Sequence, residues 1–242
     1  MLRGLYSAAS GMLSAINTQE VITNNLANSE TIGFKKDIPI YKSFSTLLER
    51  EMNQDTRQTK MEATFVDLTQ GQLISTENNL NFALEGEGFF ALLTPQGVAY
   101  TRDGNFSLDN KGKLVNADGF YLLGEKGPIS LTSDGIVNDL KFNKKGEMIV
   151  NGKVINQIRI DNPSLFSKQG NNLFKAYNST KIKKTKETFI KEGYLEASNV
   201  NIIEEMVNLI ENFRLYEANQ KVIQSEDNTL NKICNEIGSI TK

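Results

Sequence analysis

The sequence predicts an α+β protein: long N- and C-terminal helices that form a coiled-coil-like stem, and a mainly antiparallel β central domain of hairpins. Apolar residues recur every seven positions near both ends of the chain, which is the spacing of a helix seam that packs on a partner helix. From about residue 80, short apolar or alternating runs are separated by glycine turns such as RDG, NKG and ADG. We expect terminal helices over 1–30 and 198–242, an irregular or extended connecting segment over 31–80, and a β-rich outer domain over 81–197.

The N-terminal pattern predicts a helix over residues 2–27. Gly4 and Gly11 lower its intrinsic stability by about 1 kcal/mol each relative to alanine, so this helix depends on packing. Its small side chains would let a neighbouring backbone come close. Two registers carry the seven-residue spacing: Leu2, Ala9, Ile16 and Thr23 in one, and Leu5, Met12, Gln19 and Leu26 in the other.

The middle of the chain changes from an unpatterned segment to β structure. A short helix is expected around Phe44–Met52, followed by a polar loop over Asn53–Lys60. Beyond residue 80 we expect a meander of hairpins to about Ile160, with further strands over 170–177 and 188–195.

The C-terminal pattern predicts a helix over about 200–238, with Asn199 as its N-cap and Glu204 and Glu205 favouring the helix dipole. Gln220 and Asp227 interrupt the second register, where a polar residue either sets the register of a coiled coil or marks a bend near residue 225. The first register is Ile202, Leu209, Tyr216, Ile223, Leu230 and Ile237, and the second adds Met206, Phe213 and Cys234, with the cysteine expected to be a buried small hydrophobe.

Composition removes several functional classes. The chain has 27 Lys and Arg against 29 Asp and Glu, a net charge of −2, which gives no basic face for nucleic acid. It contains no histidine, so Ser-His and Cys-His nucleophile pairs and imidazole metal ligands are absent. No apolar run approaches the roughly 18 residues that would predict membrane insertion, and the serine-interrupted N-terminal stretch does not fit a cleaved signal peptide.

Two short motifs resemble ligand sites but lack residues that such sites require. GEGFF at 86–90 lacks the third glycine of a nucleotide loop and predicts a tightly packed strand entry. The alternation from Asp103 to Asp109 resembles a calcium loop, but Leu108 and Leu114 occupy the positions that require glycine and glutamate. We therefore expect no catalytic residues, no cofactor and no metal.

Three blocks of the chain resemble the bacterial flagellar rod and hook proteins. They are NNLANSETIGFKK at 24–36, GEGFFALLTPQGVAYTRDGNFSLDNKGKLVNADGFYLLG at 86–124, and GYLEASNVNIIEEMVNLIENFRLYEANQKVIQSED at 193–227. The resemblance implies a structural axial subunit of the basal-body rod that polymerises through its terminal helices and transmits torque from motor to hook. It also implies other copies of the chain and other rod subunits as partners, and passage through the flagellar type III export apparatus without signal cleavage.

Within this family, the sequence favours the proximal rod type. The hook protein is usually longer, and the distal rod type commonly carries a GLQIGTGV-like stretch where this chain reads TKMEATFVDLTQGQLISTENNLNFAL. The alternatives are a distal rod or hook-like subunit and, more remotely, a cell-wall hydrolase that uses two carboxylates. The residues expected to hold neighbouring subunits are Leu5, Met12, Ile16, Leu26, Ile202, Met206, Leu209, Phe213, Tyr216, Ile223, Leu230 and Ile237.

Overall fold

The computed structural model describes residues 2–43, 59–131, 140–143, 146–150, 153–177, 182–184 and 188–240. The chain forms two compact units. Unit 1 consists of residues 1–29, 36–68 and 200–242, and unit 2 consists of residues 30–35 and 69–199. The prediction of an α+β fold with a helix at each end and antiparallel strands is confirmed.

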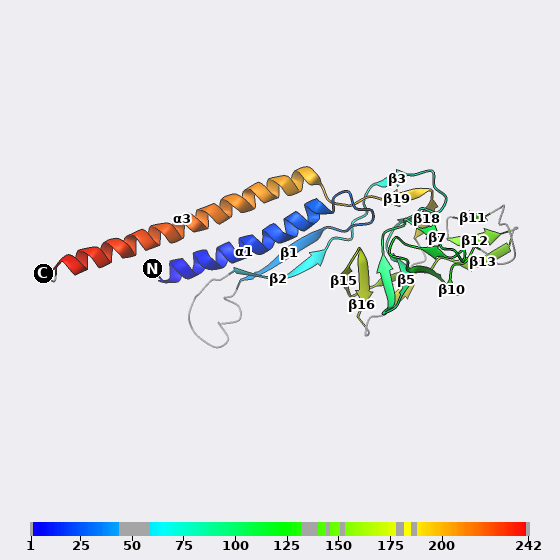
Figure 1. Cartoon of the computed structure of the whole chain (residues 1–242), viewed down its shortest axis with the longest axis horizontal. Helices are drawn as coiled ribbons and strands as arrows, with labels where there is room; N and C mark the ends of the chain where they lie inside the picture. Colours follow the sequence, from blue (N-terminus) through cyan, green and yellow to red (C-terminus); the bar gives the residue numbers. More distant parts are fainter. Residues whose placement is uncertain are drawn as a thin grey trace. The chain divides into compact units, whose positions relative to one another are not determined.

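Unit 1 contains two long helices and a two-stranded ribbon (Figure 1). The helices are α1 (Leu2–Ala27) and α3 (Ile202–Ile240), and the strands are β1 (Asp37–Ser43) and β2 (Thr59–Val66). The ribbon is antiparallel, pairs Ile38 with Phe65, and packs against α1. No helix among the described residues has the length and hydrophobicity needed to cross a membrane.

Within the segment that the sequence predicts to be irregular or extended, residues 37–43 and 59–66 are extended strands that pair with each other. The pairing joins residues from 16 positions apart, Ser43 with Thr59, to 29 positions apart, Asp37 with Val66, so local pattern does not reveal it. The helix predicted around Phe44–Met52 lies outside the described residues. The loop predicted over Asn53–Lys60 also lies outside them, except for its last two residues, which begin β2.

The start of α3 corrects the predicted N-cap. The side-chain oxygen of Asn201 accepts hydrogen bonds from the backbone N–H groups of Ile203, at 3.1 Å, and Glu204, at 3.3 Å. Asn201 is therefore the capping residue, because it satisfies donors that have no partner in the first turn. Asn199 instead donates to the backbone and hydroxyl oxygens of Thr69 within unit 2.

Unit 2 is built from short antiparallel strands. Its largest sheet has ten strands with the main order β15-β16-β6-β5-β9-β8-β7, to which β10, β14 and β17 attach. Unit 2 also contains a three-stranded sheet, β11-β12-β13, and the two strand pairs β18-β4 and β19-β3. The bounds are β3 (Leu73–Ser75), β4 (Phe82–Glu85), β5 (Phe89–Thr94), β6 (Gly97–Thr101), β7 (Ser107–Leu108), β8 (Leu114–Val115), β9 (Tyr121–Gly124), β10 (Gly127–Pro128), β11 (Leu140–Phe142), β12 (Glu147–Val150), β13 (Lys153–Gln157), β14 (Ile160–Pro163), β15 (Phe166–Gly170), β16 (Leu173–Ala176), β17 (Ile182–Lys184), β18 (Phe189–Glu192) and β19 (Tyr194–Glu196).

The core of unit 2 is apolar and rich in phenylalanine. Phe82 packs edge-on against Phe142 with ring centroids 4.7 Å apart, and Phe90 meets Phe106 at 5.6 Å. Leu92, Leu122 and other aliphatic side chains from several strands fill the same cluster. Such burial is the main source of stability in a small β domain.

A buried ion cluster joins distant segments of unit 2. The Glu196 carboxylate accepts from Lys35 Nζ at 2.6 Å, from Arg102 Nη1 at 3.1 Å and from the backbone N–H of Gly71 at 3.0 Å. The side chains of Lys35 and Glu196 are fully buried. Burial lowers the pKa of Arg102, although the nearby Glu196 charge opposes this shift. The cluster holds residues 30–35 and the end of β19 to the body of unit 2.

Candidate assembly interface

The two helices of unit 1 pair antiparallel, and side chains of α3 lie against two glycines of α1 (Figure 1). A Cβ atom at Gly4 would lie 2.9 Å from Oε1 of Glu226, and one at Gly11 would lie 2.9 Å from Nδ2 of Asn219. Residues 4 and 11 thus face residues 226 and 219, which defines the antiparallel register. The glycines that weaken α1 as an isolated helix leave room for these polar side chains of α3.

The side of α3 that faces α1 carries a polar line of residues: Glu205, Asn212, Asn219 and Glu226. Asn212 is 9% exposed, and its Nδ2 donates to the backbone oxygen of Ala15 at 2.8 Å. Next to this line lie three half-buried members of the predicted first register, Leu209, Tyr216 and Ile223. The helix pair therefore joins small residues of α1 to a seam of α3 that is part polar and part apolar.

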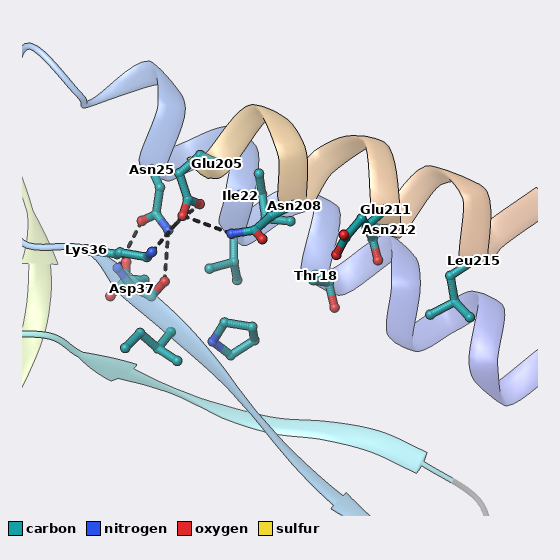
Figure 2. A pocket seen from close by; sticks show the side chains of 13 residues that line it. Thr18, Ile22, Asn25, Lys36, Asp37, Glu205, Asn208, Glu211, Asn212 and Leu215 are labelled. Atoms are coloured by element: carbon teal, nitrogen blue, oxygen red, sulfur yellow. Dashed lines mark hydrogen bonds and ion pairs between the residues drawn. The ribbon is translucent and has the colours of Figure 1, made fainter. Parts of the chain in front are cut away.

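One end of the pair is held by a buried polar cluster of Asn25, Lys36 and Glu205, with Asn208 beside it (Figure 2). Glu205 is 1% exposed, and its carboxylate accepts from Asn25 Nδ2 at 3.2 Å and pairs with Lys36 Nζ at 2.8 Å. Asn25 also bonds reciprocally to Asp37, through Nδ2 to the backbone oxygen at 2.8 Å and through Oδ1 from the backbone N–H at 2.9 Å. α1, α3 and the start of β1 therefore meet at one point.

The electrostatics of this cluster favour a charged lysine. Burial alone would lower the pKa of Lys36, but hydrogen bonds and charge interactions with Glu205 and Glu204 outweigh it. The pKa of Lys36 is consequently raised above its ordinary value of 10.5. Lys36 stays protonated in the folded chain throughout the neutral range, as a buried partner for Glu205 requires.

A groove of about 550 Å³ opens between α1, β1 and α3 beside the cluster (Figure 2). Its lining mixes aliphatic side chains such as Ile22 and Leu215 with polar ones such as Thr18, Asn208 and Glu211. Among the described residues, no group of three potential metal ligands occurs. The groove is a partly apolar recess in the surface of unit 1.

The outward surface of α3 carries a stripe of exposed apolar side chains, here called the outer stripe: Ile203, Met206, Val207, Ile210 and Phe213. Their spacing of three and four residues places them along one side of the helix. Ile203 is 75% exposed and the other four are about half exposed. On α1, Tyr6 and Leu13 lie seven residues apart and are 61% and 64% exposed. Apolar surface gathered in this way is typical of a protein interface.

The structure distributes the residues predicted from the heptads over both kinds of surface. The half-buried ones are Leu5, Met12, Leu26, Leu209, Tyr216 and Ile223, and the exposed ones are Ile16, Ile202, Met206, Phe213 and Leu230. The side chain of Ile237 lies outside the described part of the chain. Cys234 is exposed, so the prediction that it is buried is wrong. It belongs to the second register, which turns away from α1 because the polar line occupies the facing positions.

The polar residues through which α3 contacts α1 were not predicted from the sequence. Glu205, Asn212, Asn219 and Glu226 recur every seven positions, so a signal was present. It is hidden from a search for apolar periodicity, because asparagine and glutamate count as surface residues in such a search. Their partners on α1, such as Gly11 and Ala15, are among the small residues that the sequence predicted to allow a close neighbour.

A helix pair with apolar stripes on its outward surfaces is typical of a subunit that assembles with other proteins. Three family models match the chain: "Flagella basal body rod protein" over residues 5–35, "Flagellar hook protein FlgE/F/G D1 domain" over 83–210, and "Flagellar basal body rod FlgEFG protein C-terminal" over 191–236. The second alone spans more than half of the chain.

Several relatives match along nearly their whole length. The flagellar basal-body rod protein FlgG of Borreliella burgdorferi is 36% identical, over 95% of this chain and 97% of that protein. FlgG of Bacillus subtilis is 30% identical, over 97% and 99%, and the rod protein FlgF of Caulobacter vibrioides is 30% identical, over 95% and 94%.

The chain belongs to the family of flagellar basal-body rod proteins. It is therefore a structural rod subunit and not an enzyme. Membership of this family implies a location in the bacterial flagellum and assembly with other rod and hook components.

Proposed function

We propose that this chain polymerises through its terminal helices, packs them against those of neighbouring subunits in a coiled-coil-like layer, and so transmits torque from motor to hook. The partners are other copies of the chain and other rod subunits. In this proposal the β-rich segment over 81–197 lies outside the helical layer.

The observation that carries the proposal is the outer stripe. Its five apolar residues are about half exposed or more, although α3 packs along α1 on its other side. Covering the exposed half of one such side chain would contribute about 1 kcal/mol, and a helical polymer repeats that gain at every subunit. A long stiff shaft needs contacts of this kind.

The direct test replaces Ile210 with aspartate in a strain that otherwise lacks the chain. Ile210 is exposed, so Ile210→Asp leaves the free subunit folded while placing a charge in the interface. We expect unchanged far-UV circular dichroism and a loss of rod assembly and swimming. The matched control is Ala218→Asp, a change to the same residue at an exposed position of α3 outside the outer stripe. Normal swimming in Ile210→Asp would contradict the proposal.

Among the rod types we favour the proximal one, because the stretch typical of the distal type is missing after the first loop. The distal type is the second candidate, and the 36% identity to the FlgG protein of Borreliella burgdorferi favours it. Electron microscopy of basal bodies from a deletion strain separates the two. An incomplete proximal rod supports the proximal type, whereas a complete proximal rod that lacks only the distal segment supports the distal type.

We also propose export through the flagellar type III apparatus without cleavage of a signal peptide. The helix that begins at Leu2 belongs to the helix pair, since Gly4 lies against Glu226. Removal of this segment would take away the start of the interface. N-terminal sequencing of the chain from purified basal bodies tests the proposal, and a start beyond residue 20 would refute it.

A further inference from the structure

We propose that the buried cluster of Asn25, Lys36 and Glu205 sets the register in which α1 and α3 pair. This is a property of the single chain and holds whichever neighbours the helices meet. Without the cluster, the two helices would pair in more than one alignment.

The seam between the helices repeats and so does not specify its own register. Gly4 faces Glu226 and Gly11 faces Asn219, seven residues apart on each helix. A slip of α3 by seven residues, about 10.5 Å along the helix axis, would bring Asn212 opposite Gly11 and Asn219 opposite Gly4. The same kinds of side chain would meet again, and the apolar positions Leu209, Tyr216 and Ile223 would also be replaced by one another.

The cluster occurs only once in the seam. Glu205 is the one carboxylate of the polar line that pairs with a lysine within the described residues, through the 2.8 Å contact to Lys36. After a seven-residue slip, Glu205 would face the region of Thr18 and lose both Asn25 and Lys36. A buried carboxylate without its partners is strongly unfavourable, whereas the aligned pair satisfies it.

The partners of Glu205 are themselves fixed in place. Asn25 bonds in both directions to the backbone of Asp37, and the backbone oxygen of Lys36 accepts from the N–H of Asp67 at 2.8 Å. The ribbon therefore holds Lys36 at one height along α1, and Glu205 brings α3 to that height (Figure 2). A single buried polar contact that specifies alignment at some cost in stability is the best-documented use of such groups in helix pairs.

Disulfide cross-linking in the full chain measures the register directly. In a Cys234→Ser background, Gly11→Cys with Asn219→Cys reports the native alignment, because a Cβ at Gly11 would lie 3.2 Å from Cγ of Asn219. Gly11→Cys with Asn212→Cys, and Gly11→Cys with Glu226→Cys, report slips of seven residues in either direction. In the parent chain we expect the native cross-link alone within the monomer, because the slipped pairs lie beyond the roughly 7 Å Cα separation that a disulfide spans.

The decisive variant is Asn25→Leu with Glu205→Leu, which replaces the buried polar groups by apolar ones of similar size. We expect at least one slipped cross-link to increase about tenfold or more in this variant. Glu226→Leu, which removes a carboxylate from the other end of the polar line, serves as the control for the Asn219 and Asn212 reporter pairs and should keep the native cross-link alone.

Helical content by circular dichroism accompanies each cross-linking measurement. If the double variant loses its helices, Glu205→Gln decides in its place, since it keeps the size of the side chain and removes the charge that Lys36 binds. A helical variant that forms only the native cross-link would overturn the proposal, and so would slipping in Glu226→Leu to the same extent.

Discussion

The two units of the chain satisfy their apolar side chains in different ways. In unit 2, phenylalanine rings such as Phe82 and Phe90 are completely buried in a core that short strands enclose. In unit 1, the helices meet through glycine, alanine, asparagine and glutamate, and large apolar residues such as Ile203 and Leu13 point outward. Unit 2 therefore has a closed apolar core of its own, whereas the helices of unit 1 leave large apolar side chains at the surface.

The largest effect is expected for Glu196→Ala in unit 2. The change leaves the side chains of Lys35 and Arg102 buried without their shared carboxylate, and breaking a buried ion pair in this way costs about 3–5 kcal/mol. Urea unfolding measures this cost. Hydrogen exchange in the folded chain should show that the backbone amides of residues 30–35 and of β19 lose their protection. The exposed pair of Glu85 and Lys191 supplies the control, and Glu85→Ala should change stability by less than about 1 kcal/mol.

Phe90→Ala should destabilise unit 2 by about 3 kcal/mol or more, because it leaves a cavity in a closed core. Phe213→Ala removes the same side chain from the outer stripe and should change the stability of the free chain by about 0.5 kcal/mol or less. Denaturant unfolding of the two variants measures the difference. Equal costs would mean that unit 1 buries Phe213 in the free chain, which contradicts the contrast.

Much of the fold could be predicted from the sequence, and the errors have physical causes. Seven-residue apolar spacing located both helices, and glycine turns located the hairpins of unit 2. The same spacing led to the wrong prediction that Cys234 is buried, because the line of α3 that faces α1 is polar. The buried partnership of Lys35 with Glu196 spans 161 residues, and no local pattern indicates it.

The N-cap shows a smaller limit of the same kind. Asn199 and Asn201 are both suitable capping residues two positions apart, and only the backbone path decides between them. The assembly residues predicted on the seams remain a prediction. The structure adds Ile203, Val207 and Ile210 to them, since these are exposed on the same side of α3 as Met206 and Phe213.

Asn212→Ala should weaken the helix pair by about 1 kcal/mol, because Ala15 loses the donor to its backbone oxygen. Amide exchange in α1 and α3 should accelerate, while exchange in unit 2 stays unchanged. Asn208→Ala, at a half-buried position one turn away, is the matched comparison and should have a smaller effect. A larger effect in unit 2 than in unit 1 would be the contrary result.

The smallest effect is a pH dependence from Lys36. The pKa of this lysine is raised on folding, so its ion pair with Glu205 stabilises the chain fully below pH 10.5, and this stabilisation is lost as the pH rises through the folded-state pKa. Near neutral pH, the free energy of unfolding of the wild type should exceed that of Lys36→Met by about 1 kcal/mol. The difference should shrink at strongly alkaline pH. A difference that is constant across this range would refute the assignment.

We expect the outer stripe to be open in the free subunit and covered in the rod. Phe213→Cys in the Cys234→Ser background, labelled with a maleimide, tests it most directly, with Ala218→Cys as the reference position on the same helix. We expect the maleimide to label both cysteines rapidly in the free chain. In purified basal bodies, position 213 should be protected from labelling and position 218 should not. Equal labelling of position 213 in both states would contradict it.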